Sequence, residues 1–332
     1  MINFNEGIEQ PNKFLGSEKK TTILLGNKVY MLKYPDPIRG NKSRFVISYK
    51  NNHFSEHIGS SVFRSCGFDT QETVLGYYTD YSGKRKIVVG CVDFTQDGST
   101  LFEMTKLANQ MISSDEKMAT TIEHVTLIVS DLPFITDKTG VIERFWDVFV
   151  VDTLIGNGDR HFGNWGLLEK EGVLRFAPIY DCGSSLGALL DDSEMADIME
   201  SDTRLKAKEY NVTSCYSFNG KRIFCHEIYK DPPEELLQAV KRIVPLIDME
   251  RIHGIIDSVE PMSEVRKEYL KKATTLRYEQ ILLPCLNRTL RHLMSQSEKP
   301  SIMEKIRKTQ AEQRERDYSA PRKTKRKDEP EL

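Results

Sequence analysis

Leu154-Ile155-Gly156-Asn157-Gly158-Asp159-Arg160-His161-Phe162-Gly163-Asn164-Trp165-Gly166-Leu167-Leu168 is the stretch that decides how this chain is interpreted. It follows an apolar segment, is rich in Gly, Asn and Asp at its centre, and becomes apolar again at its end. This pattern predicts a polar loop held between buried elements. Such loops often carry binding and catalytic residues.

A second acidic residue, Asp181, follows the apolar run 178–180, which we expect to be a strand that ends at this Asp. Phosphoryl transfer needs one carboxylate that takes the proton of the acceptor hydroxyl, and a second carboxylate with an Asn that hold Mg²⁺. The step from Asp159 to Asn164 equals the Asp-to-Asn step of the protein-kinase catalytic loop. Each residue alone could simply cap a turn, but their order favours a kinase site for ATP and Mg²⁺.

His161 and Arg160 lie in the same loop. His161 has no second His or Cys at metal-ligand spacing, so a zinc site is not indicated. We expect its imidazole to lie beside a phosphate or to structure the loop, and Arg160 to pair with a loop carboxylate or a phosphate. The six cysteines are widely scattered and include no CxxC pair, which is typical of a protein from a reducing compartment.

The segments around the loop predict an α+β chain with two lobes and a cleft. Residues 21–34 are expected to form a hairpin around Gly26-Asn27, followed by a helix at 54–66 and strands within 72–79 and 86–92. Helical spacing then predominates at 101–112, 116–129, 141–156, 233–244 and 263–294, the last interrupted near Pro284. We therefore predict a small β-rich N-lobe at 1–94, a larger, mostly helical C-lobe at 95–296, and a charged, disordered tail at 297–332.

The composition is that of an ordinary soluble protein, with 39% hydrophobic and 29% charged residues among 332. The net charge of −2 provides no general attraction to nucleic acid or to an anionic membrane. No apolar run reaches the roughly 18–20 residues of a membrane span. The first residues lack the pattern of a secretory signal peptide, so we expect a cytoplasmic protein.

The loop and the Asp181 segment resemble those of the HipA-like serine/threonine kinases. The family pattern N-x-D-x-H-x-x-N is matched at 157–164, and Tyr180-Asp181 with Ser184 match its metal-binding segment. The longer pattern W-D-x-F-V-x-D-T-L-x-G-N-x-D-R-H-x-G-N-W-G, at 146–166, is most similar to the small, stand-alone branch, which includes a secreted pro-inflammatory bacterial kinase that enters other cells. The likeness extends, more weakly, over about residues 20–285. It implies a two-lobed kinase-like fold and an ATP- and Mg²⁺-dependent serine/threonine protein kinase.

The resemblance also implies roles for individual residues. Asp159 matches the catalytic base, Asn164 and Asp181 match the Mg²⁺ ligands, and Lys33 matches the N-lobe lysine that grips the nucleotide phosphates. Glu56 matches the ion-pair partner of Lys33. Without the resemblance, Lys33 could be a solvent-facing edge lysine, and Glu56 could be a first-turn acid favoured by the helix dipole. The implied nucleotide contacts are Gly16, Ser17, Lys20, Lys33, Glu56, Asp93, His161, Asn164, Tyr180 and Asp181.

The phosphate loop departs from the protein-kinase pattern. Residues 14–21 contain a single Gly instead of G-x-G-x-x-G, and HipA-like kinases have a different loop at this place. Backbone N–H groups can still bind phosphate there. The adenine is expected at the backbone of the connector 91–94. Autophosphorylation is typical of the family, and Ser17 and Thr21 are candidates.

Two other functions remain open. A phosphoinositide-type lipid kinase carries a similar G-x-G-D-R-H-x-x-N loop, matched at 156–164. A lipid phosphate should meet Lys and Arg after the metal-binding Asp, whereas 182–210 is rich in acidic residues, which favours a protein acceptor. A pseudokinase acting as a binding module through its tail is the other alternative, although the expected catalytic set is complete. The acidic residues are Asp191, Asp192, Glu194, Asp197, Glu200 and Asp202.

The tail carries a basic cluster at 322–327. It could bind the nuclear import machinery or an acidic partner, or it could be a solvated tail that binds nothing specific. If the protein is secreted into another cell, it would reach the cytoplasm or the nucleus of that host. The extra N-terminal subdomain of HipA toxins has no counterpart before residue 21. The resemblance therefore supports an antitoxin partner less strongly than it supports a kinase.

Overall fold

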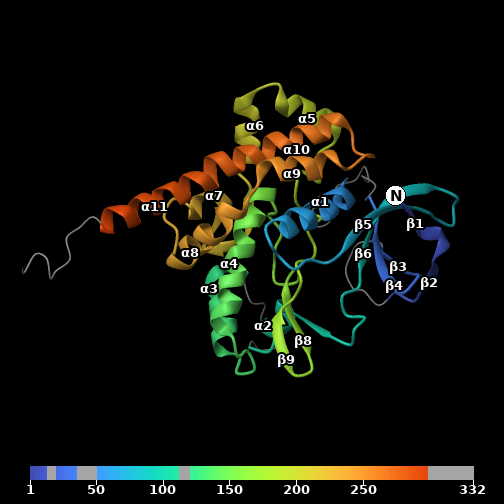
Figure 1. Cartoon of the computed structure of the whole chain (residues 1–332), viewed down its shortest axis with the longest axis horizontal. Coiled ribbons are helices and arrows are strands. Elements are labelled where there is room, and N and C mark those ends of the chain that lie inside the picture. Colours follow the sequence, from blue (N-terminus) through green and yellow to red (C-terminus); the bar gives the residue numbers. More distant parts are fainter. Residues whose placement is uncertain (13–19, 36–50, 112–119, 298–332) are drawn as a thin grey trace, which may run out of the picture. The chain divides into compact units, whose positions relative to one another are not determined.

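A six-stranded sheet is built entirely from residues before Asp93, with the strand order β1-β5-β6-β4-β3-β2 (Figure 1). The computed structural model describes residues 1–12, 20–35, 51–111 and 120–297. Neighbouring strands are antiparallel except for β1 and β5, which are parallel. One turn of 3-10 helix separates β1 from β2. The strands are β1 (Ile2–Asn3), β2 (Ile8–Gln10), β3 (Lys20–Leu25), β4 (Lys28–Lys33), β5 (Thr73–Thr79) and β6 (Arg85–Val92).

The predicted hairpin is confirmed by β3 and β4. Leu25 lies opposite Lys28, so the turn is Gly26-Asn27, and Gly26 has a φ of +62°. A positive φ at the first turn residue is nearly free of strain only for glycine. β4 lies between β3 and β6. Its last residue, Lys33, is therefore carried by a central strand.

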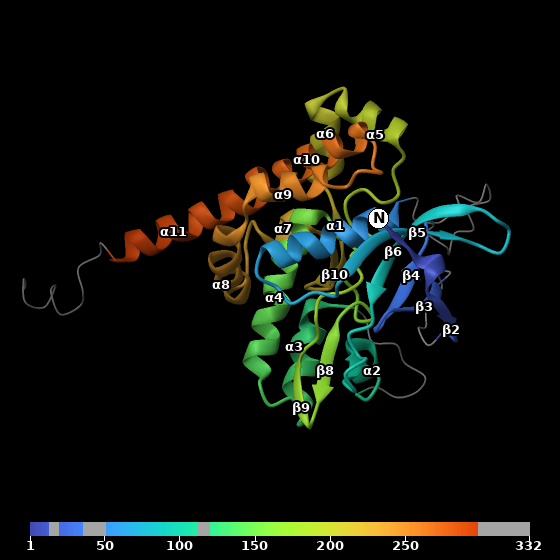
Figure 2. The same ribbon diagram turned by 45° about the vertical axis from the view of Figure 1, so that its right-hand side comes forward.

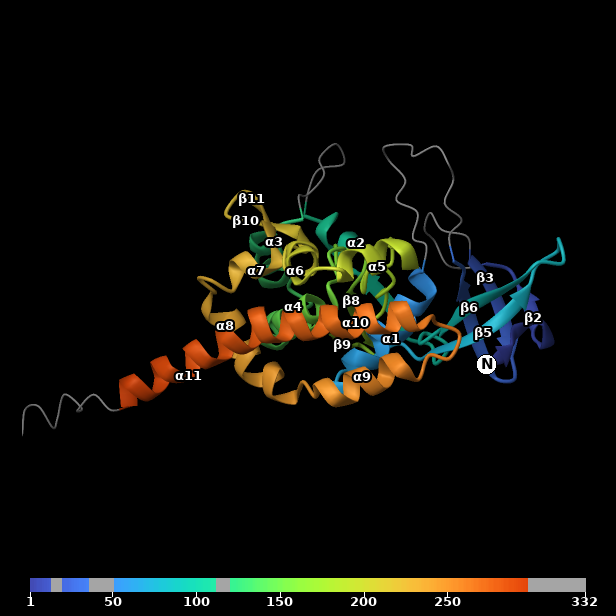
Figure 3. The ribbon, with the colours of Figure 1, turned by 90° about the horizontal axis from the view of Figure 1, so that it is seen from above.

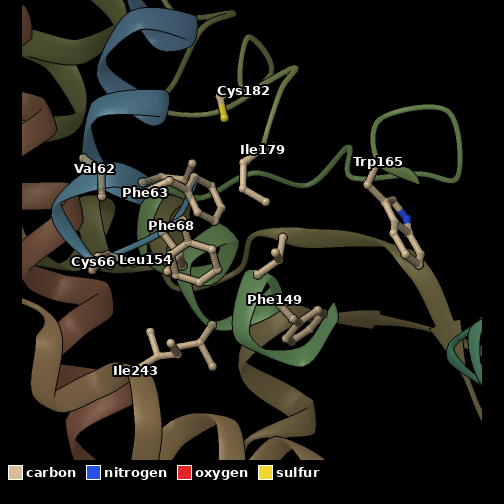
Figure 4. Close-up of a cluster of buried hydrophobic side chains, with 14 of the residues drawn as sticks. Val62, Phe63, Cys66, Phe68, Phe149, Leu154, Trp165, Ile179, Cys182 and Ile243 are labelled. Atoms are coloured by element: carbon tan, nitrogen blue, oxygen red, sulfur yellow. The ribbon is translucent and has the colours of Figure 1, made fainter. Parts of the chain in front are cut away.

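Helix α1 (Asn52–Ser65) packs on this sheet against β5 and β6, as predicted for 54–66. Its inward residues Val62 and Phe63 are buried beside Phe68. Figure 4 shows Phe63 and Phe68 beside Leu154 of α4 (Lys138–Ile155), with Ile179 and Cys182 on the neighbouring segment. The core thus continues from α1 into the second half of the chain.

The second half is mostly helical, as predicted, but it also contains two small sheets. β7, β8 and β9 form one antiparallel sheet, and Figure 2 shows β8 and β9 beside α4. β10 and β11 form a hairpin. The strands are β7 (Thr100–Glu103), β8 (Gly166–Lys170), β9 (Val173–Phe176), β10 (Thr213–Phe218) and β11 (Lys221–Phe224).

Helices from both halves of the chain surround α4, twelve of whose eighteen residues are buried. A helix that is apolar on every side must be covered on every side, and α1, α3, α8 and α10 all contact it. Seen from above, α9 and α10 lie side by side (Figure 3). A short 3-10 helix, Val244–Leu246, follows α8. The helices are α2 (Met104–Ala108), α3 (Ile122–Asp131), α4 (Lys138–Ile155), α5 (Asp192–Met199), α6 (Asp202–Glu209), α7 (Cys225–Ile228), α8 (Glu234–Ile243), α9 (Met249–Asp257), α10 (Glu264–Arg277) and α11 (Leu283–Ser297).

Two local predictions are wrong. Residues 100–103 form strand β7 and not the start of a helix, because their partner is β8, more than sixty residues away, which local periodicity cannot reveal. Asp181 does not end a strand either. Only Ile179 makes an isolated bridge, to Thr70, and Asp181 itself has a φ of +58°. The predicted helix at 116–129 is confirmed only from Ile122, and residues 112–119 lie outside the described ranges.

The predicted interruption before Pro284 is confirmed as a widened helical turn. A π turn at Tyr278–Leu282 joins α10 to α11. A proline inside a helix lacks an N–H and its ring collides with the carbonyl four residues earlier. The extra residue of a π turn relieves that collision. Within the described part of the chain, no helix has the length and apolar character needed to cross a membrane.

His53, at the start of α1, makes stability depend on pH. Its ring is buried, and burial, with Arg266 nearby, lowers its pKa to about 3. Below pH 6.5, His53 therefore binds a proton in the unfolded chain but stays neutral in the folded chain. The folded state loses stability as the pH falls below 6.5, the pKa of His53 in the unfolded chain. We expect the free energy of unfolding to decrease by about 2 kcal/mol from this residue between pH 7 and pH 5.

Urea denaturation at the two pH values measures this effect. His53→Phe should reduce the difference between pH 7 and pH 5, while His57 and His226, whose pKa values burial also lowers, preserve a part of it. An unchanged difference in His53→Phe would contradict the prediction.

Candidate active site

The polar loop begins where α4 ends. Gly156 caps the helix in the left-handed conformation, with a φ of +66°. The N–H of Asn157 donates to the carbonyl of Asp152 at 2.8 Å, and its side-chain amide donates to the carboxylate of the same Asp152 at 2.8 Å. Asn157 in turn accepts from the N–H of Asp159 at 3.2 Å. The loop is therefore fastened back onto α4 before it presents Asp159.

Arg160 joins the loop to the segment that carries Asp181. It donates to both carboxylate oxygens of Asp152, at 2.9 and 3.1 Å, to the carbonyl of Asn164 at 2.9 Å, and to the carbonyl of Tyr180. A further contact reaches the sulfur of Cys182 at 3.5 Å. Burial alone would lower the pKa of Arg160, but the Asp152 carboxylate raises it well above the ordinary value. The predicted carboxylate partner exists, but it belongs to α4 and not to the loop.

Asp159 lies where an acceptor hydroxyl could reach it. The hydroxyl of Ser184 donates to its carboxylate at 3.2 Å, which is within the range of a general base. The Asn164 side-chain amide donates to the Asp159 carbonyl at 2.7 Å, so the two motif residues are joined directly. His161 is exposed, and its Nδ1 accepts from the Gly163 N–H at 3.0 Å. It therefore structures the loop, which is one of its two expected roles.

Lys33, Glu56 and Asp181 meet at one point although they are far apart in the sequence. The Lys33 ammonium lies 2.7 Å from Glu56 and 2.8 Å from Asp181. Lys33 is 5% exposed and Glu56 is fully buried, so the alternatives of an edge lysine and a first-turn acid are wrong. The predicted Lys33–Glu56 pair is confirmed. Glu56 also accepts from the N–H of Cys182 at 3.1 Å, which ties α1 to the Asp181 segment.

The charges of this group stabilise one another. Burial would lower the pKa of Lys33, but the carboxylates of Asp181 and Glu56 raise it well above the ordinary value. Removal from water would raise the pKa of Asp181, but the Lys33 ammonium lowers it. Lys33 and Asp181 therefore both stay charged at neutral pH.

Gly59 on α1 allows this close approach. A Cβ at Gly59 would lie 2.6 Å from the Cβ of Cys182, so only glycine lets the helix pack against the segment that follows Asp181.

Lys20 lies directly opposite Lys33 on the neighbouring strand. Like charges at directly opposed positions destabilise a sheet. Lys20 also contributes to the low pKa of Asp181. This second cation near the site suits the binding of an anion such as a phosphate. The predicted contacts Gly16 and Ser17 lie outside the described residues.

Asp93 is the first residue of the connector after β6, and the Tyr180 side chain lies beside this connector. The Asp93 carboxylate accepts from the N–H and the hydroxyl of Thr95, at 2.9 and 2.7 Å, and so shapes the connector turn. The N–H of Asp93 donates to the Val29 carbonyl at 2.9 Å, so this backbone group already has a partner inside the protein. The Tyr180 ring faces Phe94, with ring centroids 5.9 Å apart. An aromatic pair at this place could contact a flat base.

The oxygen atoms of Asn164 and Asp181 fit a hard cation such as Mg²⁺. The Asp181 side chain is 38% exposed, and the Asn164 amide nitrogen is engaged by Asp159, so the Asn164 amide oxygen is the atom left for a cation. Within the described ranges, no cluster of three or more His, Cys, Asp or Glu residues could hold a metal ion alone. Water molecules and phosphate oxygens would complete the ligand set.

Gly158 shows a constraint that the sequence does not reveal. A Cβ at this position would lie 2.4 Å from the carbonyl oxygen of Thr213, the first residue of β10. The β10–β11 hairpin was not predicted, so no physical reason for a glycine could be seen in the sequence, although Gly158 matches the second glycine of the pattern G-x-G-D-R-H-x-x-N. The link from Arg160 to Asp152 on α4 was also missed, because the two residues belong to different elements.

Gly158→Ala is expected to lower the free energy of unfolding by about 1–3 kcal/mol, because a backbone oxygen must move. Chemical denaturation measures the loss. Gly254→Ala is the matched control, since a Cβ at Gly254, in helix α9, meets nothing within 4 Å. It should be neutral or stabilising. Equal effects of the two substitutions would contradict the close contact at Gly158.

Comparisons with known proteins show which family this chain is similar to. Residues 15–245 match the family described as HipA-like C-terminal domain. The chain is 36% identical over 281 residues to the serine/threonine-protein kinase CtkA of Helicobacter pylori, a match that covers 82% of this chain and 83% of that protein. The crystal structure of the Helicobacter pylori proinflammatory kinase CtkA is similar with a TM-score of 0.77 and 33% identity, over 87% of this chain and 98% of that chain.

Proposed function

This chain belongs to the family of the HipA-like C-terminal domain and has a two-lobed, protein-kinase-like fold, and from this premise we propose that it is an ATP- and Mg²⁺-dependent kinase of serine and threonine hydroxyls in proteins. The observation that carries the proposal is the meeting of Lys33 with both Glu56 and Asp181, beside a loop that holds Asp159 and Asn164 together. Phosphoryl transfer needs this set of one cation, one base and two oxygen ligands.

Each residue has a distinct task in the proposed reaction. Asp159 accepts the hydrogen bond of the acceptor hydroxyl and takes its proton as the new oxygen–phosphorus bond forms and the bond between the γ-phosphorus and the leaving ADP breaks. Lys33 places its charge against the nucleotide phosphates, and Glu56 holds Lys33 in position. Mg²⁺, bound through Asn164 and Asp181, would neutralise the charge on the phosphate oxygens. Arg160 keeps the base and the metal carboxylate at a fixed separation by bonding to both segments.

Ser184 defines the geometry of the acceptor. Its hydroxyl donates to one oxygen of the Asp159 carboxylate, so a substrate hydroxyl that binds this same oxygen must share it with Ser184 or displace Ser184. The acidic residues of α5, together with Asp191 and Glu200 at its two ends, support a protein acceptor with basic residues more than a lipid phosphate.

Phosphate transfer from γ-labelled ATP with Mg²⁺ tests the proposal. The acceptors are the protein itself, a generic basic protein and phosphoinositide vesicles. Label on serine or threonine of protein is the expected result. Label on lipid alone would assign the chain to the lipid kinases, and bound ATP without transfer to any acceptor would indicate a pseudokinase.

Autophosphorylation and delivery into another cell belong to this proposal as its finer parts. Thr21 is not an accessible candidate for autophosphorylation, because it is buried and its hydroxyl accepts from Tyr34 at 2.7 Å. Ser17 and the basic cluster 322–327 lie outside the described residues. Mass spectrometry before and after incubation with ATP would locate a modified residue, and deletion of 321–332 would test a nuclear destination.

A further inference from the structure

Arg277, the last residue of α10, is buried under the start of the catalytic loop. It is 1% exposed, and its Nε donates to the carbonyl of Leu154 at 2.8 Å. One of its amino groups pairs with Glu209, at the end of α6. The hydroxyl of Tyr269 donates to the other oxygen of Glu209. A connected set of buried side chains thus reaches from α6 and α10 to the end of α4.

The Leu154 carbonyl needs this partner. The last four carbonyls of a helix accept no hydrogen bond from the helix itself. The N–H groups that would donate to them belong to residues beyond the end of the helix. α4 ends at Ile155, so the Leu154 carbonyl would be buried without a bond if Arg277 were absent. The next residue of the chain after α4 is Gly156, and Asp159 follows three residues later.

Arg277 also packs against Gly156 itself. A Cβ at Gly156 would lie 2.9 Å from one amino group of Arg277 and 3.0 Å from its Cζ. The guanidinium therefore lies against the cap residue while its Nε holds the preceding carbonyl. One planar side chain fixes both the end of α4 and the first residue of the loop.

Stability alone does not account for this arrangement. A buried ion pair is often no more stabilising than apolar residues of the same volume, because both charges lose their water. The second amino group of Arg277 has no hydrogen-bond partner among the described residues, which is a further cost. The π turn at Tyr278–Leu282 starts immediately after Arg277, and such turns are frequent at functional sites.

We propose that Arg277 is a positioning residue for phosphoryl transfer: together with Glu209 it fixes the start of the loop that presents Asp159. The proposal rests on the proposed function and deepens it. A lysine cannot replace the arginine, because its single ammonium cannot hold the Leu154 carbonyl, pair with Glu209 and lie flat against Gly156 at the same time.

The test compares Arg277→Lys with Arg242→Lys. Arg242 is the matched control, because it also pairs with a carboxylate of α4, Asp147, at 2.8 Å, but it makes no hydrogen bond or ion pair with the loop among the described residues. We expect Arg277→Lys to lower kcat about tenfold or more, while KM for ATP stays within about twofold. Arg242→Lys should leave kcat unchanged.

Hydrogen exchange provides a readout that needs no activity. Peptides covering residues 154–164 should exchange faster in Arg277→Lys than in the wild type, and should be unchanged in Arg242→Lys. If the wild type transfers no phosphate, the proposed function fails, and exchange in 154–164 still decides whether Arg277 orders the loop. Equal exchange in all three proteins, or a kcat per folded molecule that does not change, would overturn the proposal.

If Arg277→Lys does not fold, Glu209→Gln is the second variant that tests the same proposal. It keeps the bond from Arg277 to Leu154 and an acceptor for Tyr269, but removes the charge that holds Arg277. We expect a smaller decrease in kcat, about two- to fivefold, with faster exchange in the same peptides. No change in either quantity would overturn the role of Arg277 and Glu209.

Discussion

Asp159→Asn is expected to lower kcat for phosphate transfer by about 10²–10⁴-fold, because it removes the carboxylate that we propose takes the proton of the acceptor. The protein should remain folded. Asn164 and the N–H of His161 bond to the backbone carbonyl of residue 159, which the substitution preserves. An asparagine oxygen can also accept from Ser184 in place of the carboxylate.

The experiment measures kcat at saturating ATP together with nucleotide affinity and melting temperature. Only kcat should change. Asp131→Asn, on an exposed carboxylate at the end of α3, is the control and should retain full activity. If Asp159→Asn keeps more than about a tenth of the wild-type kcat, another residue is the base.

Trp146→Ala is expected to lower the free energy of unfolding by about 3–5 kcal/mol. Trp146 is 3% exposed in the middle of α4, and its ring meets the edges of Phe145 and Phe149 at 5.4 and 5.6 Å between centroids. Truncation leaves a cavity that the neighbouring side chains cannot fill without moving. Since a domain is stable by only about 5–15 kcal/mol, much of the variant should be unfolded at moderate denaturant concentrations.

Denaturation followed by far-ultraviolet circular dichroism is the suitable measurement, because the chain has only two tryptophans and fluorescence would lose one of its two probes. Leu127→Ala is the matched control. Leu127 is an apolar helix residue of α3 that is 43% exposed, so its truncation should change stability by only about 0.5 kcal/mol. A loss below about 1 kcal/mol for Trp146→Ala would show that its surroundings collapse into the space.

Local signals in the sequence are enough for several elements. The turn residues at 26–27 mark the first hairpin, and the predominantly apolar character of 141–155 marks a buried helix. The order of Asp159, Asn164 and Asp181 along the chain is by itself sufficient to indicate phosphoryl transfer. The Lys33–Glu56 pair depends on family resemblance, since either residue alone has a simpler interpretation.

Other features depend on contacts between distant residues and could not be predicted. β7 pairs with β8, and Gly158 touches β10, which the sequence did not indicate as strands. Arg277 lies in the last turn of a helix, where a basic residue is ordinary because it complements the helix dipole. Nothing in the sequence distinguishes an exposed arginine of that kind from this buried one.

The glycine at position 59 has a consequence for how such an enzyme could be controlled. With no side chain between α1 and Cys182, and with Glu56 bonded to the N–H of Cys182, the helix is joined directly to the segment that carries Asp181. A modification or partner that displaced α1 would separate Lys33 from Glu56 and disturb Asp181 in the same motion. Control exerted at this helix would then act on the Lys33–Glu56 pair and on Asp181 together, and not on either of them alone.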